Sequence, residues 1–305
     1  MIEEKSYKDR KFMFFYLNSG NGHIAQASVL KQAMEEECPG IDVRLLNGFA
    51  DNNYFSKFWF ETFYSFSCNY LHGAYPLVYD ITQPQTMLAL VKTGIAVTTR
   101  RYLEKTIIKN GITDIGSFHF GLSPSLSNIV FKLKKKGINI NLTVFNTDPF
   151  TCHNAWFYKY SYREFVGSDD VRNYAIQKMH CIPSRIIKVP LLVDKRFKQK
   201  VTDDEKKSLR RKYGFDENKK VVLLAGGGEG LPGTRKIINH CILHKTEFTV
   251  AVVCGRNKRL QKDLELIKKT FPELDLHVFG FVDFMDSLIK LSDLVVSKAG
   301  TSSIL

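Results

Sequence analysis

The sequence predicts an α/β protein with two domains, each built on a parallel sheet. A strand, a glycine loop, a helix and a second strand follow one another near the N-terminus, which is the order of a βαβ crossover. The same order starts again near residue 219. The 305 residues, 44% of them hydrophobic, can form two cores. A lysine-rich stretch separates the halves, so we expect domains at 1–197 and 198–305.

In the first domain, short apolar runs predict strands and apolar residues at helical spacing predict helices. The expected strands are residues 11–17, 41–46, 112–120, 138–145, 164–166 and 186–189. One helix follows the first glycine loop and ends near Pro39. The other expected helices are residues 84–109, 124–136 and 169–179.

The second domain begins with a short polar helix near Asp203, and its further elements repeat the pattern of the first. A helix is expected at residues 234–244, with other helices between the later strands. The chain ends just after the last of these strands, so we expect this domain to be incomplete. The expected strands are residues 219–225, 248–254, 274–279 and 293–297.

Residues 54–80 are the most aromatic part of the chain and include Trp59. Two interpretations stay open for this segment. One is a packed helical hairpin. The other is a surface that enters a lipid headgroup layer, where tryptophan and tyrosine are common.

The net charge of +13 and the pI of about 9.3 favour an anionic partner, such as nucleic acid, anionic lipid or a phosphorylated substrate. We do not expect nucleic acid, because the basic residues lie on no recognisable reading element. The six cysteines have no metal-ligand spacing, and residues 1–11 are too charged for a signal peptide. We therefore expect a cytoplasmic protein with free thiols and no bound metal.

The loop after the expected strand 138–145 contains several reactive side chains: Asp148, Cys152, His153 and Trp156. Open α/β sheets bind ligands where strands end. A functional site is therefore one interpretation. Turn, cap and core roles are the alternative for each residue taken alone.

The first glycine loop contains Gly20, Asn21 and Gly22, followed by His23 and Ala25. It formally fits the dinucleotide fingerprint GxGxxA, but the second strand ends near Asn47 without the acid that binds ribose. The other use of such a loop is to present His23 from a helix N-terminus. The helix dipole there disfavours imidazolium, and a general base must be neutral.

A second glycine loop follows the strand at residues 219–225 and consists of Gly226, Gly227, Gly228, Glu229 and Gly230. Backbone N–H groups of such a loop can close on an anion at a helix N-terminus. Glu229 would repel a phosphate placed against it. We therefore expect Glu229 to bind a hydroxyl or to support the loop.

Seven segments, in order along nearly the whole chain, resemble the diacylglycerol glycosyltransferase family. This family includes monogalactosyldiacylglycerol synthases and processive bacterial glucosyltransferases, with the lipid I N-acetylglucosaminyltransferase as a more distant relative. The matching segments are Ser19–His23, Asn146–Trp156, Phe165–Ser168, Ala225–Gly230, Val253–Asn257, Phe279–Val282 and Ser297–Gly300.

The resemblance implies a GT-B fold, with two Rossmann-like domains facing across a cleft. It implies an enzyme that transfers a hexose from a UDP-sugar, UDP-glucose or UDP-galactose, to diacylglycerol with inversion. No tightly bound cofactor or catalytic metal is implied. The basic, aromatic surface suggests a protein that is peripheral on the membrane.

The same resemblance assigns residues to roles. His23 matches the acceptor-activating base, and Asp148 matches an acid that orients the base or the acceptor. Residues on the acceptor side are Gly20, Asn21, Gly22, Trp59, His153 and Trp156. Residues on the nucleotide side are Gly226, Gly227, Gly228, Glu229, Gly230, Gly255, Arg256, Lys298, Ala299 and Gly300.

Three alternatives stay open. The chain could be a catalytically incompetent fragment that binds nucleotide or lipid. It could transfer N-acetylglucosamine to a lipid-linked acceptor. It could also be a nicotinamide oxidoreductase that uses the first glycine loop.

Overall fold

The computed structural model spans residues 1–305 and describes residues 7–18, 22–51, 53–63, 77, 80–157 and 161–298. Gly20, Asn21, Ala299, Gly300 and most of the aromatic segment after Phe63 lie outside the described residues. The chain forms two compact units, Met1–Leu192 and Val193–Leu305. The boundary expected at residue 197 lies farther along the chain, within helix α8 (Lys195–Lys198).

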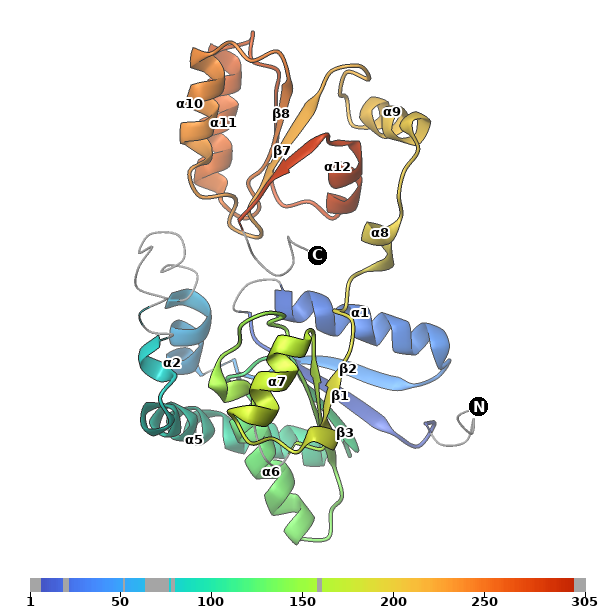
Figure 1. Ribbon diagram of the computed structural model, residues 1–305, viewed down its shortest axis with the longest axis vertical. Helices are drawn as coiled ribbons and strands as arrows, with labels where there is room; N and C mark the ends of the chain where they lie inside the picture. The colour runs from blue at the N-terminus through green and yellow to red at the C-terminus, as the bar shows by residue number, and fades with distance from the viewer. Residues whose placement is uncertain are drawn as a thin grey trace. The chain divides into compact units, whose positions relative to one another are not determined.

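The first unit contains a six-stranded parallel sheet in the order β2-β1-β3-β4-β5-β6 (Figure 1). Its strands are β1 (Lys11–Tyr16), β2 (Asp42–Asn47), β3 (Asp114–Ser117), β4 (Asn141–Phe145), β5 (Arg163–Val166) and β6 (Ile186–Lys188). Its helices are α1 (Gly22–Glu37), α2 (Tyr54–Lys57), the π-helix η1 (Phe58–Phe63), α5 (Gln85–Lys109), α6 (Ser123–Lys135), α7 (Asp169–Gln177) and the short 3₁₀ turns η2 (Asn154–Trp156) and η3 (Pro183–Arg185).

Alternation along β1 gives this sheet its two buried faces. Phe14 points toward the core that contains Ala27 of α1. Met13 and Phe15 point toward the opposite core, to which α5, α6 and α7 contribute. Successive side chains of a strand point to opposite faces, so an apolar strand such as β1 needs helices on both sides.

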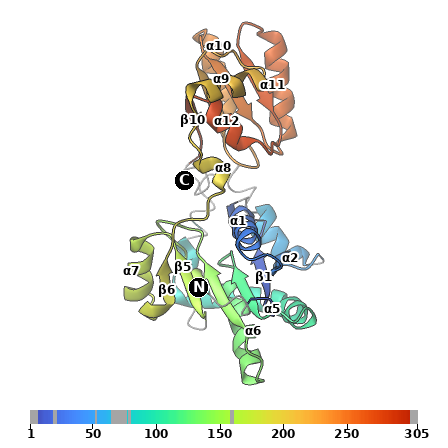
Figure 2. The same ribbon diagram turned by 90° about the vertical axis from the view of Figure 1, so that its right-hand side faces the viewer.

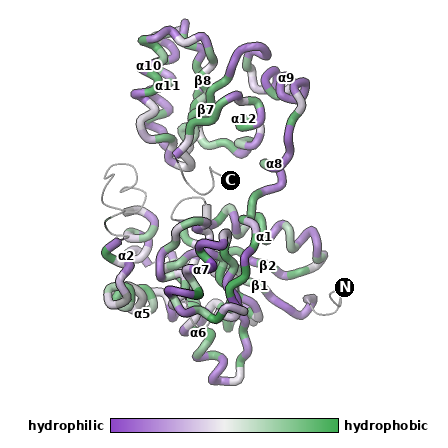
Figure 3. Tube along the Cα trace, viewed as in Figure 1, coloured by the Kyte–Doolittle hydropathy of each residue, from purple (hydrophilic) through white to green (hydrophobic). Residues whose placement is uncertain are grey.

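The second unit contains a four-stranded parallel sheet in the order β10-β7-β8-β9. Helices α10 and α11 lie next to each other and share one core with the sheet (Figure 1 and Figure 2). Figure 3 shows hydrophobic residues along β7 and hydrophilic residues along α9. The elements are α9 (Asp203–Lys212), β7 (Val221–Ala225), α10 (Thr234–Leu243), β8 (Thr249–Val253), α11 (Lys258–Thr270), β9 (Leu276–Phe279), α12 (Met285–Leu291) and β10 (Leu294–Val296).

The parallel sheets confirm the predicted α/β class, but several predicted bounds were wrong. The strand expected at residues 112–120 ends at Ser117, which leaves His119 in the loop after it. The strand expected at residues 138–145 begins at Asn141. Before it, Gly137 has φ of 80° and the amide of Ile138 bonds to the carbonyl of Leu133, which closes helix α6.

Candidate functional site

The carboxyl ends of three neighbouring strands bring reactive residues together in the first unit. His23 follows β1, His119 follows β3, and Thr147 with Asp148 follows β4. These strands are adjacent in the order β1-β3-β4, and the order reverses at β1, which has β2 on its other side. Such a topological switch point is where open parallel sheets bind their ligands.

His23 is held by contacts on several sides of its ring. Its Nδ1 lies 2.9 Å from the Thr147 hydroxyl oxygen. Its ring centroid lies 4.6 Å from that of His119 and 6.4 Å from that of Trp156. Burial lowers the pKa of His23 to about 4, and a backbone hydrogen bond at Phe118 opposes this shift only partly. The imidazole is therefore neutral at physiological pH and able to accept a proton.

Asp148 contacts a different partner from the one expected. Its Oδ2 accepts a hydrogen bond of 2.8 Å from Trp156 Nε1. Burial raises the pKa of Asp148, and the bond from Trp156 opposes this rise. The side chain that hydrogen-bonds to His23 is that of Thr147 and not that of Asp148. The carboxylate of Asp148 therefore orients the indole of Trp156 and does not contact His23 through a hydrogen bond within the described residues.

His153 and Trp156, expected near the acceptor, are buried in the first unit. His153 Nδ1 accepts from the amide of Ala155 at 3.1 Å, and Nε2 lies 3.0 Å from the Thr82 hydroxyl. Its ring also stacks on Phe120 at 5.1 Å. Both ring nitrogens are thus engaged within the protein, where they hold the loop after β4 against its neighbours.

Sequence reasoning missed His119, whose side chain is buried at 2% exposure. Its Nδ1 accepts a 3.0 Å hydrogen bond from the amide of Gly121, and its ring stacks on Phe120 at 4.6 Å. Burial, and then the charge of His23, lower the pKa of His119 well below its ordinary value. If the strand had been predicted to end at Ser117, His119 would have been placed in the loop after β3, beside the loops that carry His23 and Asp148, and it would have been recognised as a candidate site residue.

Trp59 lies in η1 at the surface, with its side chain 48% exposed. Tyr54, Phe55 and Phe58 are exposed beside it in α2 and η1. Phe60 points the other way, and its ring lies 5.8 Å from Phe49 and 6.1 Å from His119. The described part of the aromatic segment therefore has an exposed face and a face that packs near the site.

The second glycine loop follows β7 in the second unit, and its backbone requires glycine. Gly227 and Gly230 have φ of 84° and 79°. A Cβ on Gly226 would overlap the carbonyl oxygen of Gly230. The Lys298 ammonium lies 3.9 Å from the position that a Cβ on Gly227 would occupy. A positive charge therefore lies beside bare backbone, as an anion site requires.

Gly255 and Arg256 form the other wall of this loop. The amide of Arg256 donates to the carbonyl of Gly228 at 2.7 Å, and Gly255 has φ of 59°. Arg256 Nε lies 3.7 Å from Glu229 Oε1. This exposed pair offsets the negative charge of Glu229, which would otherwise repel a phosphate.

No three His, Cys, Asp or Glu side chains in the described ranges are grouped so as to hold a metal ion. Within the same ranges, no helix combines the length and the apolar character needed to cross a membrane.

Comparison with known proteins identifies relatives along nearly the whole chain. Residues 221–305 match the glycosyltransferase family 28 C-terminal domain. Monogalactosyldiacylglycerol synthase 1 of Arabidopsis thaliana is 29% identical over 97% of this chain, and a probable monogalactosyldiacylglycerol synthase of Glycine max is 30% identical over the same share. The processive diacylglycerol beta-glucosyltransferase of Bacillus cereus strain 03BB102 is 24% identical over 96% of this chain. The chain spans 56% of the length of each plant relative and 72% of the bacterial one.

Solved structures share the fold at low identity. Alr3699/HepE of Anabaena, solved with UDP-glucose, has a TM-score of 0.51 at 13% identity, covering 93% of this chain and 72% of that one. The UDP-GlcNAc 2-epimerase of Neisseria meningitidis has a TM-score of 0.53 at 14% identity, covering 95% and 78%. MurG of Acinetobacter baumannii has a TM-score of 0.50 at 11% identity, covering 96% and 73%.

These matches confirm the predicted GT-B fold class and the family resemblance. The chain is similar to the diacylglycerol glycosyltransferases over nearly its whole length, and its residues 221–305 match the glycosyltransferase family 28 C-terminal domain.

Proposed function

We propose that the protein transfers a hexose from UDP-glucose or UDP-galactose to the hydroxyl of diacylglycerol, with inversion, at the surface of an anionic membrane. The observation that carries this proposal is His23, a neutral imidazole at the switch point of the first sheet. In this reaction His23 takes the proton of the acceptor hydroxyl. The acceptor oxygen then bonds to the anomeric carbon, and UDP leaves with the electron pair of the broken bond.

The loop after β7 supports a nucleotide diphosphate as the leaving group. Its backbone bends at Gly227 and Gly230, which have positive φ, and Lys298 supplies a cation beside Gly227. Fixed donors of this kind stabilise a departing diphosphate without a metal ion. The fold shared with Alr3699/HepE, which was solved with UDP-glucose, supports the same class of donor. We therefore expect no tightly bound cofactor.

The names of the relatives support diacylglycerol as the acceptor. Four exposed aromatic side chains in α2 and η1, together with a net charge of +13, support peripheral binding on the cytoplasmic side of a membrane. Each Lys or Arg near an anionic surface adds about 1 kcal/mol of attraction.

The test is transfer of labelled glucose, galactose or N-acetylglucosamine from its UDP-sugar to diacylglycerol in anionic vesicles. Transfer of one hexose is expected from the intact chain. His23→Ala should lower kcat by about 10²–10⁴-fold and leave UDP binding in calorimetry unchanged. Because the pKa of His23 is about 4, the rate should hold down to mildly acidic pH and fall as pH drops through that value.

Other outcomes of the same test identify the alternatives. UDP binding without transfer would mean a binding protein rather than an enzyme. If only N-acetylglucosamine is transferred, and to a lipid-linked acceptor, the protein is an N-acetylglucosaminyltransferase and not a hexosyltransferase that acts on diacylglycerol. Binding of NADH, the control ligand, in place of UDP would revive the oxidoreductase. A His23→Ala protein that loses UDP binding as well would contradict the assignment of His23 to the acceptor.

A further inference from the structure

Two residues at the carboxyl edge of the first sheet contact the proposed base, His23, and neither of them has an assigned role. Thr147 is buried at 3% exposure, two residues beyond β4. His119 is buried beyond β3, the strand between β1 and β4. Both contact His23, Thr147 through a hydrogen bond of 2.9 Å and His119 through its ring.

We propose that Thr147 is the positioning residue of His23 and that it accepts the hydrogen of Nδ1, so that Nε2 is the nitrogen that takes up the proton. This inference rests on the proposed function for its role in catalysis, but the state of the ring can be measured without any activity. Which ring nitrogen of a histidine carries the hydrogen is set by the partner of the other nitrogen.

The direction of this hydrogen bond follows from the reaction. A hydroxyl can donate or accept, but an imidazolium carries hydrogen on both nitrogens and can only donate. Thr147 has to accept from His23 once the ring has gained a proton. If Thr147 already accepts in the neutral state, proton uptake at Nε2 needs no rearrangement of the site, which is the condition for a preorganised site.

Two neighbouring residues fit this arrangement. Asp148, the other candidate partner, has its Oδ2 bonded to Trp156. His119 has its Nδ1 committed to the amide of Gly121. Burial keeps His119 neutral, so it borders the His23 ring without adding a charge that would repel the imidazolium. The tilt of 61° between the two rings holds the edge of one against the other and restricts rotation of His23.

The experiment is NMR of the intact chain with ¹⁵N-labelled histidine at pH 7, where ring nitrogen shifts distinguish the two neutral tautomers. The chain has eight histidines, and His23→Gln assigns the signals of His23. In the unsubstituted protein we expect the hydrogen of His23 on Nδ1. Thr147→Ser keeps the hydroxyl and should keep this tautomer. Thr147→Val removes the acceptor and should move the hydrogen to Nε2.

Thr143→Val in β4 is the matched control, and it should leave the His23 signals unchanged. A hydrogen on Nε2 in the unsubstituted protein would overturn the proposal. So would a Thr147→Val protein whose His23 signals are those of the unsubstituted chain. If Thr147→Val does not fold, the unsubstituted protein and Thr147→Ser still decide the tautomer.

Transfer activity provides the second measurement. Thr147→Val should lower kcat by about 10- to 100-fold with KM for the UDP-sugar unchanged, and Thr147→Ser should recover most of the rate. A Thr147→Val enzyme with full kcat would refute the catalytic role. If the unsubstituted chain transfers no sugar, the proposed function fails, and the NMR result still decides whether Thr147 positions His23.

Discussion

At the scale of single residues, buried polar groups show which parts of the first unit serve the site and which do not. His23, His119 and Asp148 each have a hydrogen-bond partner. Glu164 in β5 is different: it is 1% exposed, and neither of its carboxylate oxygens has a hydrogen-bond partner among the described residues. Burying a polar group costs free energy. His23, His119 and Asp148 each offset this cost with a hydrogen bond, and Glu164 does not.

We predict that Glu164→Met stabilises the protein. Burial raises the pKa of Glu164 well above its ordinary value of 4.5, so the folded state keeps a proton that the unfolded state releases. The free energy of unfolding should therefore fall as pH rises above about 4.5, and Glu164→Met should remove this loss. The expected gain is about 1–3 kcal/mol at pH 7, measured by chemical unfolding at pH 4.5 and 7.

Glu247→Met, at an exposed glutamate of the second unit, is the control and should change stability little. The interpretation of Glu164 would be wrong if Glu164→Met destabilised the protein, or if its gain were the same at both pH values.

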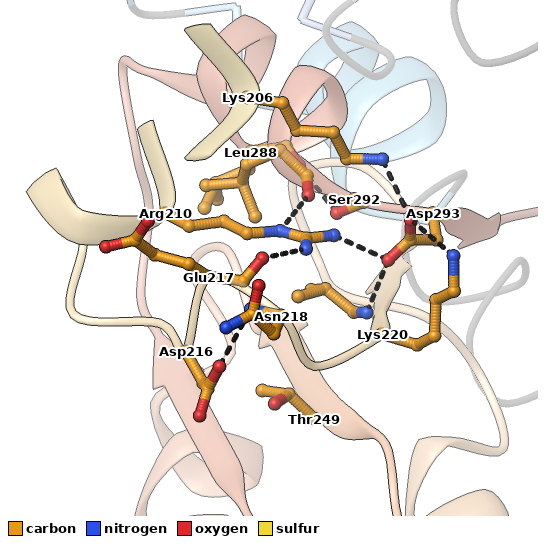
Figure 4. A network of polar contacts seen from close by, with 12 residues as sticks. Lys206, Arg210, Asp216, Glu217, Asn218, Lys220, Thr249, Leu288, Ser292 and Asp293 are labelled. Atoms are coloured by element: carbon orange, nitrogen blue, oxygen red, sulfur yellow. Dashed lines mark hydrogen bonds and ion pairs between the residues drawn. The ribbon is translucent and has the colours of Figure 1, made fainter. Parts of the chain in front are cut away.

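At the scale of elements, the two ends of β7 have different roles: one leads into a loop, and the other is fixed by a network of polar contacts. Its carboxyl end leads into the glycine loop, and its amino end is tied to α9 by the network around Asp293 (Figure 4). Arg210, buried at 5% exposure, donates to Asp293 Oδ2 at 2.6 Å and to the carbonyls of Leu291 and Glu217. A fixed scaffold at one end lets the loop at the other end carry function.

Gly226→Ala should weaken UDP binding. The added Cβ would overlap the backbone of Gly230, so the loop would have to leave its present conformation. We expect at least a 10-fold rise in Kd for UDP by calorimetry. Gly94→Ala is the control, because Gly94 lies in α5 with open space around it. The Gly94→Ala protein should bind UDP with unchanged affinity. If the Gly226→Ala protein binds UDP with unchanged affinity, this loop does not take part in nucleotide binding.

Asp293→Asn should destabilise the second unit. Burial alone would raise the pKa of Asp293, but the bond from Lys206, the amide of Val221 and the charge of Arg210 lower it to about 2. The carboxylate therefore contributes stability that is fully present above the ordinary pKa of 3.8 and is lost as pH falls through about 2. The loss should be about 2 kcal/mol at pH 7 by chemical unfolding.

Asp216→Asn, at an exposed acid that caps the amide of Asn218, is the control for Asp293→Asn. A loss in the Asp293 variant no larger than in this control would mean that the contacts of Asp293 with Lys206, Arg210 and Val221 add little to stability.

At the scale of the whole molecule, charge and exposed aromatic residues determine which surfaces the protein can bind. A net charge of +13 favours anionic partners, of which we propose a membrane surface, but it selects no point of contact. The exposed face of α2 and η1 offers one, since Trp59 is 48% exposed beside Phe58, which is 52% exposed. Tryptophan and tyrosine side chains are enriched in the headgroup layer of membranes.

Trp59→Ala should weaken binding to vesicles that contain anionic lipid, by about 3- to 10-fold in sedimentation. Salt should weaken the binding of both proteins, because charge supplies the rest of the attraction. Tyr162→Ala is the matched control: Tyr162 is 54% exposed near β5, away from α2 and η1 in the sequence. If the Trp59→Ala protein and the unsubstituted protein bind the vesicles equally, the aromatic segment at residues 54–80 serves packing and not membrane binding.

The sequence by itself determined the parallel α/β class, the positions of most strands and helices, and the loops that carry His23, Asp148 and Gly226. These depend on local patterns: apolar runs, helical spacing and glycines after strands. The tertiary structure alone decided that Thr147 bonds to His23, that His119 lies against it, and that Asp148 turns to Trp156. Thr147 and His23 are 124 residues apart, and strand order, which the patterns do not encode, brings them together.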